Sequence, residues 1–320
     1  MNEEDESNAN PFKSDIHRRD MLKCMAWCGT GVVWTMVGGI PRALALEGDG
    51  KTPVVPPGSF SFVQISDSHM GFNKDANPDT PGTLKEAINK INLYGVRPSF
   101  LLHTGDIRHL SKAEQFDTAD QIIRESGVVT HYVPGEHDMV DADNGKLYLD
   151  RYGKGTKGAG WYSFDDHGVH FIGLVNVVNL KAGGLGNLGP EQLAWLKDDL
   201  SAVSSSTPVV VFAHIPLWTV YQPWGWGTDD SGEALSYLKR FGSVTVLNGH
   251  IHQIMQKVEG NMSFHTARAT GFLQPAPGTA PAPGPIKVPA GRKLEEFLGI
   301  STVNVISRQG PLAITDETLA

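Results

Sequence analysis

From residue 60 onward the sequence alternates short β-rich runs with segments of helical character, and this alternation constrains the fold more than any other feature. The β-rich runs are SFSFVQIS, SFLLHTG, VVTHYVPG, VHFIGLVNV, TPVVVFA and SVTVLNG, and the segments expected to be helical are 83–94, 111–126, 190–203 and 231–240. Such a pattern predicts a layered α/β domain. The stretch GWYSFDDHGVHFIGL predicts an antiparallel hairpin, so we expect mixed sheets rather than purely parallel ones.

The size and composition of the chain permit a large core. It has 320 residues, 40% of them apolar and 36 of them glycine, which suffices for one large α/β domain or two small ones. The formal net charge of −8 argues against nucleic acid or an anionic membrane as the main partner. Residues 274–291 are too rich in Pro and Gly for regular structure, so we expect a long surface loop there.

Residues 1–45 have the parts of a twin-arginine export signal. Arg18 and Arg19 precede a glycine-rich apolar run, 25–40, and the small residues Ala43-Leu44-Ala45 offer a cleavage site. An Arg pair beside a buried helix, or an uncleaved membrane anchor, are the alternatives, but the run of 16 residues with four glycines is short for a membrane span. We therefore expect a periplasmic or secreted protein that uses the twin-arginine export machinery and keeps no permanent membrane anchor.

This interpretation divides the chain into a signal peptide at 1–45, a linker at 46–59 and one folded domain at 60–320 that includes the loop 274–291. Both cysteines, Cys24 and Cys28, lie inside the predicted signal. The exported chain would therefore have no disulfide and no thiolate ligand, and any metal would be held by His and carboxylate side chains.

Polar residues gather where five of the predicted strands end. In chain order these groups are Asp67 with His69, Gly105 with Asp106, Gly135 to Asp138, His214, and Gly249 to His252. Because strand ends in α/β sheets meet at one crevice, we expect these side chains to converge. Clustered carboxylates and imidazoles are costly to bury without cations, which indicates a metal site. A single histidine at a strand end is more often structural, so the inference rests on the whole ordered set.

The ordered set D-x-H, G-D, G-x-H-D, H, G-H-x-H resembles the calcineurin-like metallophosphoesterase superfamily, and within it the bacterial branch that includes cyclic-nucleotide phosphodiesterases. The resemblance covers about residues 60–268, including WYSFDDHGVHFIGL and LGPEQLAWLKDDL. It implies a four-layer α-β-β-α sandwich of two mixed sheets. It also implies a metal-dependent hydrolase of a small phosphate ester, with the choice between monoester and diester and the oligomeric state left open.

The resemblance also implies a role for each motif residue. Two metal ions (Fe, Mn or Zn), about 3.5–4 Å apart, would generate a bridging hydroxide and clamp the phosphate. His137 would be the general acid, and Asp138 would either orient the His137 ring or cap a turn. The implied ligands are Asp67, His69 and His252 for one metal, Asp106 as the bridge, and His214, His250 and the residue at position 136 for the other.

Position 136 departs from the family pattern, which has a neutral asparagine ligand where this chain has Glu136. Three carboxylates and a hydroxide would balance two divalent ions, whereas asparagine would leave one positive charge in excess. We expect Glu136 to bind metal, and the alternative is an outward-facing Glu136 in a salt bridge. Two function classes follow: an exported phosphoesterase, favoured by His137, or a metal-binding protein with little hydrolytic activity, favoured by Glu136.

Several other residues lie near the motifs. Arg108 would either touch a bound phosphate or form a surface salt bridge, and the aromatic run 217–227 would either stack on a base or aryl group or pack over the domain edge. Six histidines match no motif and are expected to be structural or exposed: His103, His109, His131, His167, His170 and His265.

Overall fold

The structure is a computed structural model that describes residues 32–37, 40–45 and 58–320, except 111, 141–144, 179, 181–182 and 306–311. The chain divides into two compact units, Met1–Pro56 and Pro57–Ala320. In the first unit, β1 (Val32–Val37) pairs antiparallel with β2 (Ile40–Ala45). The twin-arginine pair and nearly all of the predicted linker lie outside the described residues, so the export signal stays a prediction.

The second unit contains two mixed sheets. The five-stranded sheet has the order β13-β12-β3-β4-β5. Strands β3, β4 and β5 run parallel to one another, whereas β12 pairs antiparallel with both β3 and β13. The bounds are β3 (Phe60–Ile65), β4 (Phe100–His103), β5 (Val129–Tyr132), β12 (Gly299–Val305) and β13 (Ala313–Thr318).

The six-stranded sheet has the order β10-β11-β9-β8-β7-β6, with parallel strands in its centre and an antiparallel strand at each edge. The predicted hairpin is confirmed, because β6 pairs antiparallel with β7 across a turn in which His167 and Gly168 both have positive φ. The bounds are β6 (Tyr162–Asp166), β7 (Val169–Gly173), β8 (Val209–Ala213), β9 (Val244–Asn248), β10 (Gln256–Glu259) and β11 (Met262–Thr266).

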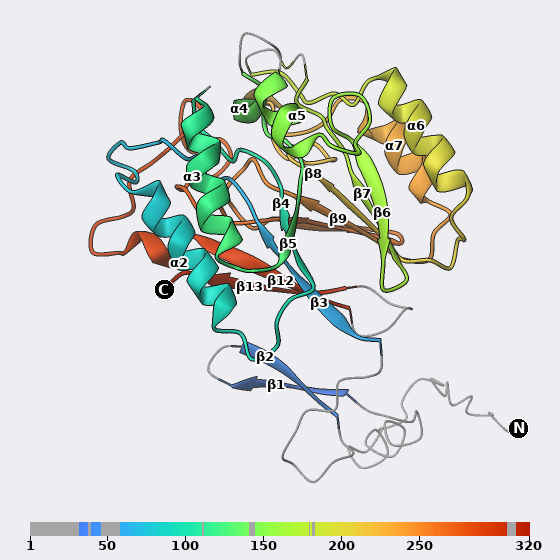
Figure 1. The fold of residues 1–320 in the computed structure, drawn as a ribbon, viewed down its shortest axis with the longest axis horizontal. Coiled ribbons are helices and arrows are strands. Elements are labelled where there is room, and N and C mark those ends of the chain that lie inside the picture. The colour runs from blue at the N-terminus through green and yellow to red at the C-terminus, as the bar shows by residue number, and fades with distance from the viewer. Residues whose placement is uncertain are drawn as a thin grey trace, which may run out of the picture. The chain divides into compact units, whose positions relative to one another are not determined.

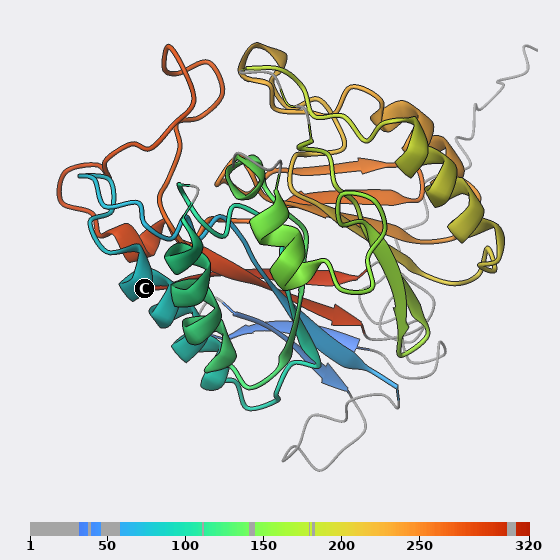
Figure 2. The same cartoon turned by 45° about the horizontal axis from the view of Figure 1, so that its top comes forward.

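Helices cover the outer face of each sheet (Figures 1 and 2). Helices α2 (Thr80–Asn92) and α3 (Ala113–Arg124) pack on the five-stranded sheet, and α6 (Pro190–Ser201) and α7 (Ser231–Leu238) pack on the six-stranded sheet. The shorter elements are α4 (Glu136–Met139), α5 (Lys146–Tyr152), η1 (Gln222–Trp224) and η2 (Leu294–Glu296).

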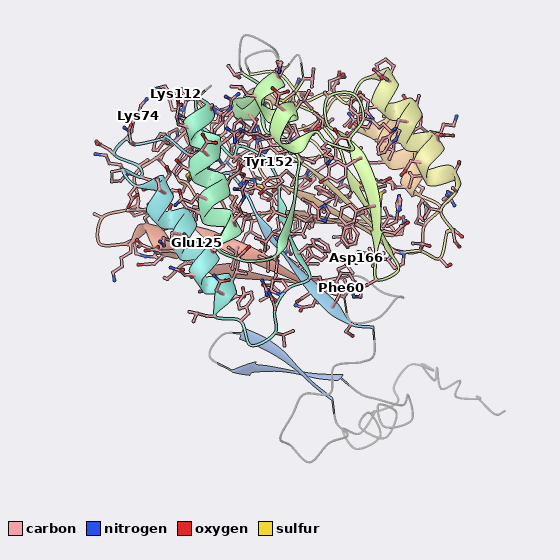
Figure 3. All side chains as sticks on the ribbon, in the orientation of Figure 1. Phe60, Lys74, Lys112, Glu125, Tyr152 and Asp166 are labelled. Atoms are coloured by element: carbon pink, nitrogen blue, oxygen red, sulfur yellow. The ribbon has the colours of Figure 1, made fainter. Side chains whose placement is uncertain are left out.

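Three hydrophobic layers hold the sandwich together, and their side chains fill the space between the ribbons (Figure 3). The layer between the sheets is aromatic: Phe62 lies 5.0 Å from Phe100 and 5.4 Å from Phe171, measured between ring centroids. Each of the other two layers joins one sheet to its helix pair. The predicted four-layer arrangement of two mixed sheets is therefore confirmed.

All six β-rich runs and all four helical segments named from the sequence are present, with ends displaced by a few residues. The predicted loop 274–291 has neither helix nor strand and is mostly exposed. No helix among the described residues has the length and apolar character needed to cross a bilayer.

Candidate metal centre

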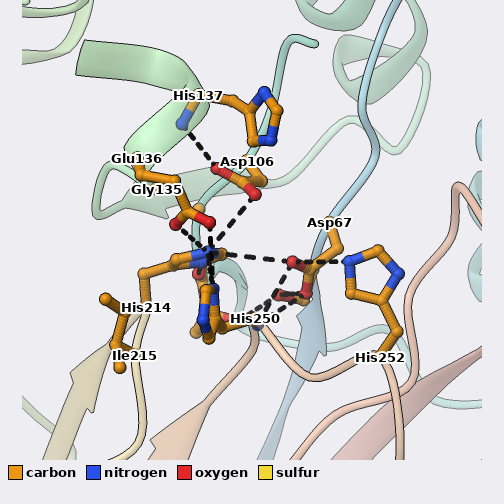
Figure 4. A network of polar contacts seen from close by, with 12 residues as sticks. Asp67, Asp106, Gly135, Glu136, His137, His214, Ile215, His250 and His252 are labelled. Atoms are coloured by element: carbon orange, nitrogen blue, oxygen red, sulfur yellow. Dashed lines mark hydrogen bonds and ion pairs between the residues drawn. The ribbon is translucent and has the colours of Figure 1, made fainter. Parts of the chain in front are cut away.

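The candidate centre lies where the carboxyl ends of the two sheets meet. The loops after β3, β4 and β5 bring residues from one sheet, and the loops after β8 and β9 bring residues from the other. Hydrogen bonds join the sheets at this point: for example, Gln64 Nε2 donates to the Asn248 carbonyl (3.1 Å), and the His250 amide donates to both carboxylate oxygens of Asp67 (3.1 Å each). The five polar groups predicted to converge do converge (Figure 4).

The first group of potential ligands consists of Asp67, His69 and His252, all buried. His69 Nε2 lies 3.3 Å from His252 Nε2, and His252 Nε2 lies 3.3 Å from Asp67 Oδ1. Three ligand atoms from two sheets thus surround one small volume, with the separations expected between neighbouring ligands of one ion.

The second group consists of Glu136, His214 and His250. Glu136 Oε2 lies 3.0 Å from His214 Nε2, and Glu136 Oε1 lies 3.1 Å from His250 Nδ1. The two ring nitrogens are 3.3 Å apart. The carboxylate of Glu136 therefore points into the centre, and the alternative of an outward-facing salt bridge is wrong.

Asp106 lies between the two groups. Its Oδ2 atom is 3.5 Å from His69 Nε2 of the first group and 3.4 Å from His214 Nε2 of the second. Its other oxygen, Oδ1, accepts a hydrogen bond from the His137 amide (3.0 Å). A single carboxylate oxygen at nearly equal distance from both groups has the position that a bridging ligand requires.

Backbone carbonyls fix the orientation of two of the rings. His214 Nδ1 donates to the Thr104 carbonyl (2.7 Å), and His252 Nδ1 donates to the Phe272 carbonyl (2.5 Å). In a neutral ring each Nε2 then presents a lone pair toward the carboxylates, and this is the arrangement typical of metal-binding histidines. The buried Oε2 of Glu136 also lacks a hydrogen-bond partner of acceptable geometry among the described residues. These donor groups fit divalent or trivalent cations.

The charges at the centre are mutually dependent. Burial raises the pKa of Asp67, but His252 and His214 outweigh it and lower the pKa to about 2. Burial likewise opposes ionisation of Glu136, and His250 and His214 hold its pKa well below the usual range. The pKa of His214 moves the other way, because Asp106 and Glu136 outweigh burial and raise it. The lowered pKa values favour the ionised forms of Asp67 and Glu136, and these negative charges are stabilised by positive charge nearby.

Five candidate ligands have left-handed backbone, which is uncommon for residues other than glycine. Their φ values are 52° for Asp67, 45° for His69, 53° for Asp106, 69° for His250 and 55° for His252. Among the described residues, His167 in the hairpin turn is the one other non-glycine with positive φ. Backbone strain is therefore concentrated at the centre, as is common at functional sites.

Glycines allow these loops to approach each other closely. A methyl group on Gly135 would lie 2.0 Å from Asp106 Oδ1, and one on Gly249 would lie 2.6 Å from Asp67 Oδ2. One on Gly105 would lie 2.6 Å from His214 Nδ1. The glycine in each motif is therefore required for space beside a ligand.

His137 borders the centre, and its ring is fixed by a contact that the sequence did not reveal. Its Nδ1 donates to the His109 carbonyl (2.8 Å), so its Nε2 remains for other partners. Burial lowers the pKa of His137, but Asp106 and Glu136 raise it by more. The ring is thus biased toward its protonated form.

Asp138 does not orient the His137 ring. Its carboxylate accepts hydrogen bonds from three backbone amides: Gly135 (2.9 Å), Ile107 (3.1 Å) and Arg108 (3.1 Å). Burial, followed by the charge of Asp106, raises the pKa of Asp138 to about 7. Of the two alternatives for this residue, turn capping is the one that the contacts support.

Two residues near Asp106 differ from expectation. Arg108 is fully buried, so it does not lie at the surface, and it is not among the residues that line the cavity beside the centre. It donates from Nη2 to the Asp138 carbonyl (2.9 Å) and lies over the Phe116 ring. His109 had no assigned role, yet its Nδ1 is 3.3 Å from His69 Nδ1 and its ring stacks on His137 with centroids 4.9 Å apart. The sequence signal for this residue was its place three residues after Asp106 of the G-D motif.

The centre opens into a cavity of about 710 Å³. Its lining includes the ionisable residues His69, Asp106, His109, Glu136, His137 and His250. Trp224 and Trp226 of the aromatic run line it as well, and they also pack against Ile251. The packing alternative is therefore confirmed for these two residues, and stacking on a base or aryl group stays a prediction.

Two mixed sheets between helix layers, with carboxylates and imidazoles gathered at their joined ends, define a class of α/β proteins that can hold two metal ions at one end of the sandwich. Residues 60–254 match the family model described as calcineurin-like phosphoesterase, and the chain belongs to that family.

Curated relatives share part of the sequence with this chain. The chain is 26% identical over 168 residues to a probable glycerophosphodiester phosphodiesterase, GpdQ, of Arcobacter nitrofigilis, covering 48% of this chain and only 56% of that protein. It is 25% identical over 218 residues to a 3',5'-cyclic-nucleotide phosphodiesterase of Nostoc sp., covering 66% of this chain and 79% of that protein.

The fold is similar to that of a dimetal phosphatase from Danio rerio, with a TM-score of 0.61 at 15% identity over 82% of this chain and 96% of that chain. It is also similar to the purple acid phosphatase PPD1 of yellow lupin, with a TM-score of 0.57 at 14% identity over 88% of this chain and 54% of that chain. At these identities the structural likeness shows the fold alone.

Proposed function

We propose that this chain is an exported phosphoesterase that uses two metal ions to hydrolyse phosphate monoesters or diesters. One observation carries the proposal: two groups of potential ligands share Asp106, and both face the cavity that His137 borders. Family membership supports the reaction class, and the two relatives described above are named as phosphodiesterases.

In this proposal each residue of the centre has a defined role. Asp67, His69 and His252 would hold one ion, Glu136, His214 and His250 the other, and Asp106 both. Two bound ions would polarise the phosphate oxygens and lower the pKa of an attacking water. Hydrolysis breaks the P–O bond to one organic arm and forms a new P–O bond to the water oxygen, and the arm leaves as an alcohol or phenol.

His137 is suited to supply the proton that the leaving oxygen takes up. Its Nδ1–H is engaged by the His109 carbonyl, which leaves Nε2 as the atom that can face the substrate. A positioned general acid of this kind typically contributes about 10²–10⁴-fold. The effect is greatest for substrates whose leaving oxygen is most basic.

Glu136 supports the second candidate, a metal-binding protein with weak or no hydrolase activity. Its contacts with His214 and His250 bring a third carboxylate into the centre, and this added charge weakens attraction for an anionic phosphate. The effect is smaller for a phosphodiester, which carries one charge, than for a monoester, which carries about two near neutral pH.

Metal analysis together with hydrolysis assays separates the two candidates. The protein from residue 46 onward would be loaded in turn with Fe, Mn and Zn, analysed for metal per chain, and assayed on aryl phosphate monoesters and diesters. We expect two metal ions per chain and hydrolysis at a rate that His137→Ala lowers most for poor leaving groups. Two bound metals without hydrolysis in any loaded form would favour the metal-binding protein.

The export part of the proposal rests on Arg18 and Arg19 in the sequence. Replacing both by Lys should leave the precursor in the cytoplasm, detected by cell fractionation, whereas a lysine replacement of Arg97 and Arg124 in the folded unit should not. Normal export of the Arg18→Lys, Arg19→Lys variant would refute this part.

A further inference from the structure

The cavity beside the candidate metal centre has a second, apolar side. Besides the candidate ligands, apolar side chains from several separate segments line it, among them Met139, Val140, Val177, Val178, Trp226 and Phe272. Phe272 joins the two sides, because its ring stacks on that of the candidate ligand His69 with centroids 4.5 Å apart. An apolar surface therefore begins directly at the site where a phosphate would bind.

The aromatic part of this wall is rigid. The rings of Trp224 and Trp226 meet edge to face with centroids 5.0 Å apart, and Tyr221 meets Trp224 in the same way at 5.2 Å. Gly225 between them has φ of +71°, and a methyl group there would lie 2.4 Å from the Gly184 carbonyl oxygen. The turn is thus packed directly on the backbone of another cavity segment, and this close packing restrains the aromatic part of the wall.

The Pro/Gly-rich loop forms a further part of the wall. Gln274 donates from Nε2 to the His250 carbonyl (2.9 Å) and accepts at Oε1 from the Gly284 amide (3.1 Å). One side chain therefore ties the loop to a candidate ligand segment and places Pro283 and Pro285 along the cavity. Figure 2 shows this loop, in orange-red, extending beyond the body of the second unit.

We propose that the cavity selects phosphate esters that carry an aryl or other apolar arm beside the scissile phosphate. This inference rests on the proposed function for the reaction at the metal centre, whereas the selection of the arm is inferred from the apolar wall of the cavity. Burial of an apolar arm against Trp224, Trp226 and Val177 removes apolar surface from water, and a rigid wall keeps the ordering cost low. A volume of about 710 Å³ accommodates a phosphate with one aromatic arm or two.

The charges of the cavity oppose strongly anionic arms. Asp106 and Glu136 line it, while its lining includes no Lys or Arg among the residues that the structure describes. A nucleoside di- or triphosphate, whose recognition uses basic side chains, therefore fits this lining poorly. A singly charged diester with an aryl arm satisfies both the polar and the apolar side.

Binding of two non-hydrolysable anions tests the selection without any turnover. Diphenylphosphinate and dimethylphosphinate carry the same charged centre and differ only in their arms. By calorimetry on the metal-loaded protein, we expect diphenylphosphinate to bind at least about tenfold more tightly, with a negative heat-capacity change from apolar burial. Equal affinity for the two anions would overturn the inference, whatever the hydrolysis assays show.

Two exposed positions provide a matched pair of variants. Val140 lines the cavity and is 64% exposed, whereas Leu93 is 85% exposed and does not line it. Val140→Glu should reduce the preference for diphenylphosphinate at least about threefold, since it places a charge beside the arm. Leu93→Glu should leave it unchanged, and equal effects of the two variants would contradict the assignment of this wall.

Hydrolysis supplies an independent readout. Methyl and phenyl 4-nitrophenyl phosphates share one leaving group, so a higher kcat/KM for the phenyl ester reports on the arm that stays. We expect a phenyl preference of about tenfold or more, reduced in Trp224→Leu and kept in Trp218→Leu, whose ring packs on Phe264 instead. If no ester is hydrolysed while diphenylphosphinate binds preferentially, the proposed function fails and the cavity assignment stands.

Discussion

At the scale of single residues, the strained backbone of the candidate metal centre lies at residues of the sequence motifs. The five left-handed ligand positions each cost of order 1–3 kcal/mol and persist because surrounding contacts enforce them. The motif order predicted which side chains converge, because that depends on strand ends. It did not predict the contacts of His109 or the burial of Arg108, because those depend on how the loop after β4 pairs with the loop after β3 at Met70.

Glu136 is the residue with the sharpest test. If its carboxylate holds metal, Glu136→Asn should restore the neutral family ligand, weaken metal affinity and increase attraction for phosphate. Glu136→Ala should weaken metal affinity further, because it removes the ligand as well as the charge. Metal content and phosphate inhibition constants, measured on both variants, provide the comparison. Two tightly bound metals in Glu136→Ala would mean that Glu136 is not a ligand.

His109 is a candidate positioning residue for His69. If His69 uses Nε2 as a ligand, its Nδ1–H can donate to His109 Nδ1 at 3.3 Å. His109→Phe keeps a ring stacked on His137 but removes the acceptor, so we expect metal affinity to fall about 10–100-fold. His131→Phe is the control, because His131 stacks on Phe164 (4.0 Å) away from the centre. Unchanged metal affinity in His109→Phe would exclude this role.

At the scale of elements, a helix or strand could be predicted when it was long enough to show a clear apolar pattern in the sequence. Buried strands such as β8 and β9 were predictable from continuous apolar runs with Gly or a polar group at the end. The four residues of α4 carry no helical period, and they form a turn because Asp138 accepts from the Gly135 amide. The edge strand β10 is exposed at all four residues, so it had no apolar pattern to detect.

The junction between β5 and α4 requires glycine for space rather than for backbone freedom. Gly135 has φ of −91°, which alanine tolerates, but a methyl group there would lie 2.0 Å from Asp106 Oδ1. Gly135→Ala should therefore displace Asp106 and lower metal affinity at least about tenfold. Gly232→Ala in α7 meets nothing within 4 Å and should raise helix stability by about 0.5–1 kcal/mol without affecting metal. Equal metal binding by both variants would argue against Asp106 as the bridge.

A pH-dependent contact joins the hairpin to α6. His170 Nε2 lies 2.9 Å from Asp199 Oδ2 and its Nδ1 lies 2.8 Å from Asp165 Oδ1. Burial lowers the pKa of His170, but these hydrogen bonds outweigh it and raise the pKa above its usual value. The stabilisation is therefore complete below the unfolded pKa of about 6.5 and is lost as pH rises through the folded pKa.

We expect His170→Asn to cost about 1–2 kcal/mol of unfolding free energy at pH 6 and less at pH 9. Urea denaturation of both proteins across this pH range measures the difference. His265→Asn, at a similar buried His–Asp pair with Asp316 (2.9 Å), serves as a comparison for loss of an imidazole. A cost that grows with pH would contradict the protonated state assigned to His170.

At the scale of the whole second unit, the candidate centre depends on the packing of the two sheets. Asp67, Asp106 and Glu136 come from loops of one sheet, and His214, His250 and His252 from loops of the other. The sequence predicted both sets of ligands. It did not predict the short distances between ligand atoms of the two sets, such as 3.0 Å from Glu136 Oε2 to His214 Nε2, which depend on the packing of the aromatic layer between the sheets. Metal binding should therefore be linked to the stability of the unit.

Removing the metal should lower the melting temperature of the protein. Binding to the folded state alone stabilises it by RT ln(1 + [L]/Kd), or about 2.7 kcal/mol per site at a hundredfold excess over Kd. For a unit of this size each kcal/mol corresponds to about 2–4 °C, so chelation should lower Tm by at least about 5 °C. Gly135→Ala should show a smaller drop, because Asp106 Oδ1 can no longer keep its place beside residue 135. An unchanged Tm after metal analysis has confirmed removal would mean that the ions do not bridge the two sheets.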